Sequence, residues 1–176
     1  MDFGQQRLQQ QEAARQMMYQ NPGYQFERMS KKTLILHHIM DNATTFNIDL
    51  HEPLKIDKLS DIYLESFTTY HHVVNIPAKG MVSSAYVFDI NELNINSNSS
   101  IGHTFNKLVI PNEISKGNAA ENRTIHKSKK LNYICSINPS TLTKISGTVT
   151  GLTTGTSMFT ATNDGFIMEL LIVARD

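Results

Sequence analysis

The stretch DKLSDIYLESFTTY, residues 57–70, combines carboxylates with strand-forming residues and is the first place to look for chemistry. Alternation along a strand would put Asp61 and Glu65 on one face, together with Tyr63 and Phe67. Four residues of extended chain separate the two carboxylates by about 13 Å, which is too far for paired acid–base work. We therefore interpret this face as a contact surface with Tyr63 and Phe67 at its centre, covered by the other sheet, the N-terminal segment or a neighbouring protein.

Histidines are the second group that could carry chemistry. Two adjacent pairs occur at 37–38 and 71–72, and three more stand alone at positions 51, 103 and 126. Adjacent strand residues point to opposite faces, so neither pair can hold one metal ion, although a site built from one histidine of each pair stays open. The closely spaced histidines of cupin metal sites, in an HxH pattern, do not occur. We expect no metal site and no cofactor.

Nucleophile patterns also fail to appear in the sequence. Cys135 occupies an inward position of LNYICSI (131–137), alongside Tyr133, so we expect a core residue. The sequence contains neither a G-x-S-x-G elbow nor a phosphate-binding loop. The basic cluster HKSKK (126–130) is interpreted as a solvated loop. We predict no catalytic residue and a protein that is not an enzyme.

Glu169 is the remaining acid of interest because it interrupts the apolar run FIMELLIVA (166–174). A carboxylate in such a strand must find a partner or stay protonated. Arg175 and Lys144 are the candidate partners. A structural ion pair is the interpretation we favour over a catalytic acid.

The elements that would position these residues are strands. From residue 31 onward the apolar residues recur with period two, and Gly, Pro, Asn and Ser cluster between the runs. The predicted strands are 33–40, 44–50 with a possible extension at 53–56, 60–70, 71–76, 84–93, 107–111, 131–137, 144–152 and 166–174. This pattern predicts an all-β fold, an antiparallel β-sandwich of the jelly-roll type, over 31–176. An immunoglobulin-like sandwich is the rival, but the chain lacks the Trp and the Cys pair that mark its core.

Residues 1–30 form a separate N-terminal arm in this prediction. The segment is rich in Gln, Ala and Arg and favours a short helix, which the Pro-Gly turn of NPGY (21–24) ends. Its large apolar side chains would anchor the arm on a neighbouring subunit; they are Phe3, Leu8, Met17 and Met18.

Composition excludes several classes of partner. The 176 residues carry no net charge, so electrostatics gives no reason to coat nucleic acid or an anionic membrane. No apolar run approaches the length of about 18 residues that spans a bilayer, and we expect no direct membrane insertion. A single cysteine rules out an intrachain disulfide and indicates synthesis in a reducing compartment.

Four stretches together resemble a known family: LKIDKLSDIYLESF (54–67), KKLNYICSINPS (129–140), ISGTVTGL (145–152) and GFIMELLIVAR (165–175). They are similar to segments of minor capsid proteins of nucleocytoplasmic large DNA viruses, the phycodnavirus and mimivirus relatives. The resemblance implies a non-enzymatic virion protein that is made in the host cytoplasm and cements capsomers. It implies the major capsid protein and other minor capsid proteins as partners, leaves a homo-oligomer open, and carries over no catalytic residue.

Two other functions compete with this one. A ligand- or glycan-binding jelly roll for receptor attachment would use the polar loops NINSNSS (94–100) and TTGTSMFTATNDG (153–165). The absence of Trp, the usual platform for stacking on sugars, counts against it. A metal-dependent cupin-type enzyme would require the histidine site that the spacing disfavours.

Overall fold

The computed structural model describes residues 11–13, 16, 30–41, 43–70, 85–113, 125–152, 158–159 and 163–175. Eight strands follow one another in it: β1 (Lys31–Ile39), β2 (Thr45–Ile56), β3 (Ser60–Tyr70), β4 (Ala85–Ile90), β5 (Leu108–Pro111), β6 (Ile125–Ile137), β7 (Ser140–Gly151) and β8 (Gly165–Ala174). A short 3-10 helix, η1 (Gly102–Thr104), lies between β4 and β5. Residues 11–13 and 16 are helical, in agreement with the short helix predicted for the N-terminal segment.

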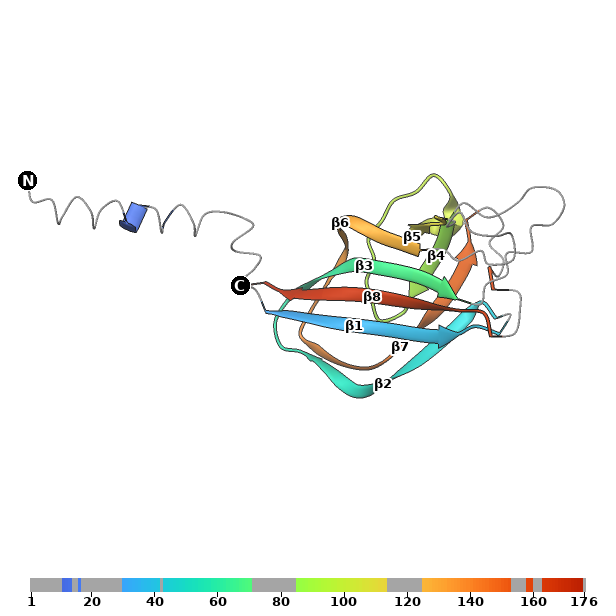
Figure 1. Ribbon diagram of the computed structural model, residues 1–176, viewed down its shortest axis with the longest axis horizontal. Helices are drawn as coiled ribbons and strands as arrows, with labels where there is room; N and C mark the ends of the chain where they lie inside the picture. The colour runs from blue at the N-terminus through green and yellow to red at the C-terminus, as the bar shows by residue number, and fades with distance from the viewer. Residues whose placement is uncertain are drawn as a thin grey trace, which may run out of the picture.

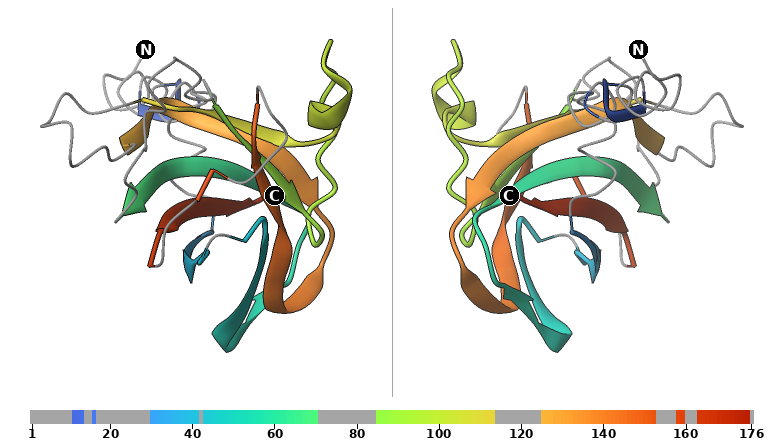
Figure 2. Two further views of the ribbon diagram at one scale, coloured as in Figure 1. Left: turned by 90° about the vertical axis from the view of Figure 1, so that its right-hand side faces the viewer. Right: turned by 90° about the vertical axis from the view of Figure 1, so that its left-hand side faces the viewer.

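The strands form two antiparallel sheets of four strands each, which confirms the predicted β-sandwich. The first sheet has the order β1-β8-β3-β6, and Figure 1 shows its strands in front, from β6 at the top to β1 at the bottom. The second sheet has the order β2-β7-β4-β5. Figure 2, turned by 90°, shows the two sheets as layers that curve around the space between them. Of the seven connections between consecutive strands, only the one from β4 to β5 stays within a sheet.

β8 is a central strand, as its apolar residues on both faces predict. It pairs with β1 from Ile39↔Gly165 to Lys31↔Val173, and with β3 on its other side. Its inward side chains are buried in the core, whereas Ile167 on its outer face is 38% exposed. The C-terminal run is thereby placed in the middle of the first sheet.

β6 is longer than the sequence predicts. Residues 126–130, interpreted above as a solvated loop, belong to this strand, which begins at Ile125. Its first half pairs with β3 through His126↔Phe67 and Lys127↔Ser66. The loop prediction is wrong because pairing with a neighbouring strand outweighs the polar composition of the segment.

Aromatic side chains from both sheets fill the space between them. Phe67 of β3 lies 5.1 Å from Tyr86 and 5.4 Å from Phe88 of β4, measured between ring centroids. Phe166 of β8 lies 5.3 Å from Phe88 and 5.7 Å from Phe46 of β2. Edge-to-face and tilted rings of this kind add to the stabilisation from buried area.

β7 passes very close to β4 at Gly147. A Cβ atom at this position would lie 1.9 Å from the carbonyl oxygen of Asp89 and 2.9 Å from the ring of Phe46. Only a residue without a side chain fits there, which explains the glycine in the ISGTVTGL run.

Candidate interaction surface

β3 contains a β-bulge that decides which of its side chains face outward. On the β8 side, Leu64 pairs with Leu170 and Ser66 pairs with the adjacent Glu169. Glu65 is therefore an extra residue without a partner on β8, the mark of a bulge. Because Glu65 is an extra residue, the alternation of inward and outward side chains shifts by one position after it.

The bulge corrects the sequence prediction for Phe67. Strict alternation places Phe67 on the face of Tyr63, but in the structure it is fully buried between the sheets. Tyr86 and Phe88 of the opposite sheet cover it. Of the two residues predicted to mark a contact face, only Tyr63 lies on the outside of the first sheet.

Tyr63 is joined on this outer face by Tyr133 of β6. The two rings are 5.8 Å apart at their centroids and nearly perpendicular, and Tyr133 is 56% exposed. The sequence predicts that Tyr133 points inward with Cys135. A shift in the register between β3 and β6, at Ile62 and Tyr63, turns Tyr133 outward and leaves Cys135 in the core.

Asp61 is held at the end of this face by Arg175. The guanidinium donates to both carboxylate oxygens, at 3.0 Å from Nε and 2.6 Å from Nη2 to Oδ1, and Ser136 Oγ donates at 2.7 Å. The hydrogen bond from Arg175 is the main reason that the pKa of Asp61 lies below its usual range. Arg175 and Ser136 together donate four hydrogen bonds to this carboxylate, three of them to Oδ1.

Glu169 has a different partner from those that the sequence suggests. Ser66 Oγ donates to its Oε2 atom at 3.1 Å across the β3–β8 pair. Arg175 is engaged with Asp61, and Lys144 lies opposite Asp49 in the second sheet. The predicted ion pair with Arg175 or Lys144 is therefore wrong, and Glu169 accepts a hydrogen bond from Ser66 instead.

Exposed isoleucines complete the outer face of the first sheet. Ile35 is 63% exposed and Ile39 44% on β1, Ile167 38% on β8, and Ile125 43% on β6. The register brings Ile167 and Ile125 to either side of Thr68. We define the apolar face as Ile35, Ile39, Tyr63, Ile125, Tyr133 and Ile167. Polar residues lie among them, since Thr68 separates Ile167 from Ile125 and Ile35 pairs with Glu169. Several exposed apolar side chains on one face of a sheet are typical of contact sites in proteins.

The outer face of the second sheet has the opposite character. Its side chains from β2 and β7 are polar in every described pair: Thr45 opposite Thr148, Asn47 opposite Ser146, and Asp49 opposite Lys144. The contrast holds for β2 and β7 only, because β4 and β5 place Val87 opposite Val109 on the same outer face, and Val109 is 41% exposed.

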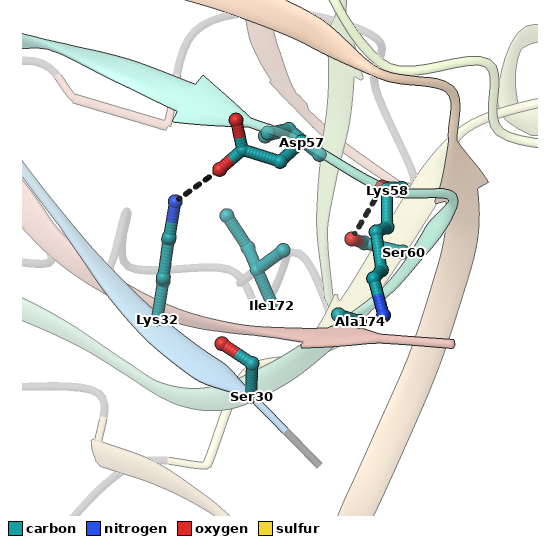
Figure 3. A pocket seen from close by; sticks show the side chains of 8 residues that line it. Ser30, Lys32, Asp57, Lys58, Ser60, Ile172 and Ala174 are labelled. Atoms are coloured by element: carbon teal, nitrogen blue, oxygen red, sulfur yellow. Dashed lines mark hydrogen bonds and ion pairs between the residues drawn. The ribbon is translucent and has the colours of Figure 1, made fainter. Parts of the chain in front are cut away.

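A pocket of about 240 Å³ opens at one end of the sandwich, between the start of β1, the β2–β3 turn and the end of β8. Ile56, Ile172 and Ala174 form its apolar wall. Figure 3 shows Lys32 reaching towards Asp57 at its rim, with Lys32 Nζ 3.6 Å from Asp57 Oδ2. Lys58 also lines the pocket, so its charged rim carries two lysines and one aspartate around the apolar wall.

The histidines do not gather into a site within the described residues. There, no group of three or more His, Cys, Asp or Glu side chains is placed to hold a metal ion. His38 packs at 6.4 Å from Phe46 and 6.3 Å from Phe166, between ring centroids, and burial lowers its pKa. His126 Nδ1 lies 3.0 Å from Glu113 Oε1. The pair at 71–72 lies outside the described residues.

Cys135 is a core residue, as the sequence predicts. Its side chain is 3% exposed, and burial raises the pKa of the thiol to about 11. A thiol in this state is almost entirely protonated at neutral pH and is a poor nucleophile.

The loop 94–100, the candidate ligand site of the second hypothesis, forms hydrogen bonds with its own surroundings. Ser97 Oγ donates to the Lys107 carbonyl at 3.0 Å and accepts from the Lys107 amide at 3.1 Å. Thr104 Oγ1 donates to the Ile101 carbonyl at 2.8 Å and is also hydrogen-bonded to Ser99 Oγ. Most of the second loop, 153–165, lies outside the described residues.

The predicted arm anchors cannot be placed on this surface. Phe3, Leu8, Met17 and Met18 lie outside the described residues. Where the chain is described, no helix has the length and apolar character needed to cross a membrane.

The residues of the apolar face that sequence reasoning missed are the four isoleucines and Tyr133. The sequence contains a signal for β1 and β8, because both runs are apolar on both faces. When only one face of such a strand packs in the core, the apolar side chains of the other face are exposed. Comparison with known proteins adds no family: no protein-family model and no curated protein matches this chain.

Proposed function

We propose that this chain is a non-enzymatic structural protein of a large DNA virus capsid, a minor capsid protein that cements capsomers of the major capsid protein. The observation that carries the proposal is the apolar face on the first sheet. Folding of a sandwich requires apolar side chains between the sheets, not outside them. A second apolar face supports a role in which this sheet lies against another protein.

The connectivity supports the same proposal. We infer a jelly-roll topology from the strand orders β1-β8-β3-β6 and β2-β7-β4-β5, in which the chain changes sheets at nearly every connection. Jelly rolls are frequent building blocks of viral capsids. The resemblance of residues 54–67, 129–140, 145–152 and 165–175 to minor capsid proteins points in the same direction.

The contact would use apolar burial with few charges. The apolar face combines aliphatic side chains with two tyrosines, and tyrosine is enriched in the centres of protein interfaces. Each large side chain that becomes buried contributes about 25 cal/mol per Å² before the cost of ordering is subtracted. Virion localisation and partnership with other capsid proteins follow from this proposal.

The experiment measures how many copies of each variant chain are incorporated into a virus particle. Ile167→Lys places a charge in the middle of the apolar face, and Thr148→Lys places the same charge on the polar outer face of the second sheet as a matched control. We expect Ile167→Lys to reduce the copy number per particle at least fivefold and Thr148→Lys to leave it unchanged. Equal incorporation of both variants would show that the apolar face does not dock on the capsid.

The predicted arm is tested separately. A chain that lacks residues 2–20 should keep the circular dichroism spectrum and thermal transition of the β-sandwich but lose incorporation. Normal assembly of the truncated chain would remove the arm from the proposal without affecting the role of the apolar face.

A further inference from the structure

The two sheets end in four edge strands, and three of these are interrupted. The register of β2 shifts between Asp49 and Leu54, next to Pro53. β5 has four residues and ends in Pro111. The pairing of β6 with β3 contains two register shifts. Bulges, prolines and short lengths are the devices by which proteins prevent an edge from pairing with another chain.

β1 has no bulge, no proline and no shortening, and the only protective device it carries is charge, with Lys31 and Lys32 at its start. It pairs with β8 over nine residues in unbroken register, from Lys31↔Val173 to Ile39↔Gly165, and contains no proline. Among the described strands its only sheet neighbour is β8. Its middle residue, Ile35, is the most exposed large apolar side chain of the described residues, at 63%. A long, regular and apolar edge is a template for a further strand.

We propose that β1 pairs with β1 of a second copy of this chain, antiparallel, about a two-fold axis at Ile35. This inference goes beyond the proposed function and does not depend on it, because it concerns the isolated protein. In this register the numbers of two residues that lie opposite each other add up to 70, so Ile35 lies opposite Ile35 of the other copy. The first sheets of the two copies then form one continuous sheet of eight strands.

The charges of β1 fit a second copy in this register. Its lysines, Lys31 and Lys32, both lie at the start of the strand, and an antiparallel copy places its own lysines at the far end. Lys31 then faces Ile39, and Lys32 faces His38, whose pKa burial lowers, so that the ring is neutral at pH 7. Like charges do not meet anywhere along the pair, whereas a parallel copy in register would bring the lysines together.

The side chains also match across the axis. Ile35 meets Ile35, a pair of β-branched residues, and Leu34 lies diagonally across from its counterpart and opposite Leu36. An isologous contact of this kind is the commonest symmetry of soluble oligomers. The pairing also joins the apolar faces of the two copies into one surface, because Ile35 and Ile39 lie at the shared edge.

Disulfide trapping tests the register directly. In the proposed pair the Cα atoms of the two Ile35 residues lie about 4.5–5.5 Å apart, within the range of a disulfide. The full chain with Ile35→Cys should form a covalent dimer under mild oxidation. The native thiol, Cys135, is buried and should not react.

Ile39→Cys is the matched control, because it is an exposed isoleucine of the same strand. The two copies of residue 39 would lie about 27 Å apart, eight residues along the strand, so this variant alone should not cross-link. The double variant Lys31→Cys, Ile39→Cys should cross-link again, because these positions face each other in the proposed register.

Light scattering as a function of concentration measures the dimer without any cross-link. We expect Ile35→Lys to raise the dissociation constant of the dimer at least tenfold while the circular dichroism spectrum stays unchanged. A native chain that stays monomeric at all concentrations, or a dimer in which Ile35→Cys and Ile39→Cys cross-link equally, would overturn the proposal.

Discussion

The outer faces of the two sheets obey the same strand alternation but expose different chemistry. On the second sheet, β2 and β7 expose Thr, Asn, Ser, Asp and Lys, as expected for a sheet with one face in water. On the first sheet, β1, β8 and β6 expose four isoleucines and Tyr133, and Tyr63 of β3 lies half-buried beside Tyr133. Because both sheets enclose the same core, folding alone does not explain the difference.

The two outer faces differ in how much apolar side-chain surface they expose to water. The polar face satisfies the requirements of folding and solubility, and the apolar face reduces solubility unless another surface covers it. Comparing the two outer faces is therefore more informative than counting exposed apolar residues, since single ones are normal on any surface.

The largest loss of stability is expected from changes to the bulge in β3, because the bulge determines which β3 side chains face outward. Deleting Tyr63 should turn Leu64 outward and Glu65 inward, because the bulge would be consumed to restore the register with β8. Loss of a core leucine together with burial of a carboxylate should cost more than about 4 kcal/mol and prevent folding. Chemical denaturation would show the loss of a cooperative transition.

Deletion of Glu65 is the control for the same strand. It removes the extra residue and leaves Leu64 inward and Ser66 outward, so we expect a cost below about 2 kcal/mol. If the two deletions destabilise the protein equally, the bulge does not set the two faces of β3.

The second test compares an aromatic residue on each side of the first sheet. Phe67→Ala should lower the free energy of unfolding by about 3–5 kcal/mol, because Phe67 is fully buried against the other sheet. Tyr133→Ala, at a side chain that is 56% exposed, should lower it by less than about 1 kcal/mol. Similar values for both in urea titrations would mean that Tyr133 is covered in the isolated chain.

The smallest effect on stability is expected from Asp61, which lies beside Tyr63 on the outer side of the first sheet. The folded-state pKa of Asp61 lies below its usual value of 3.8, so its contact with Arg175 stabilises the protein above about pH 4. This contribution disappears as the pH falls through the lower folded-state value. Asp61→Asn should lower Tm slightly at pH 7.

The pH dependence supplies the control for this last variant. The difference in Tm between the native chain and Asp61→Asn should shrink as the pH falls below 4. A difference that stays constant down to pH 2 would assign the effect to packing and not to the charge of Asp61.

The sequence predicts the architecture well where the period-two pattern is uninterrupted. The two-sheet sandwich, the central position of β8 and the continuation of β2 past Pro53 all follow from apolar alternation and turn residues. The core position of Cys135 follows in the same way.

The candidate site could not be predicted because it depends on two irregularities in strand pairing. The bulge at Glu65 moves Phe67 into the core, and the register shift beside Tyr63 moves Tyr133 out of it. A bulge depends on how a strand meets its neighbours and leaves no fixed mark in the sequence of one strand. The pairing of β6 with β3 likewise overrides the polar composition of residues 126–130.

Because Cys135 is buried, the reaction of its thiol with a reagent can report transient opening of the β-sandwich. The thiol lies beside the register shift between β3 and β6, at a position where only transient opening of the sandwich can expose it to a reagent. Its labelling rate would therefore measure the free energy of that local opening, in the manner of amide hydrogen exchange. Slower labelling inside an assembled particle would report how much the particle restrains the first sheet.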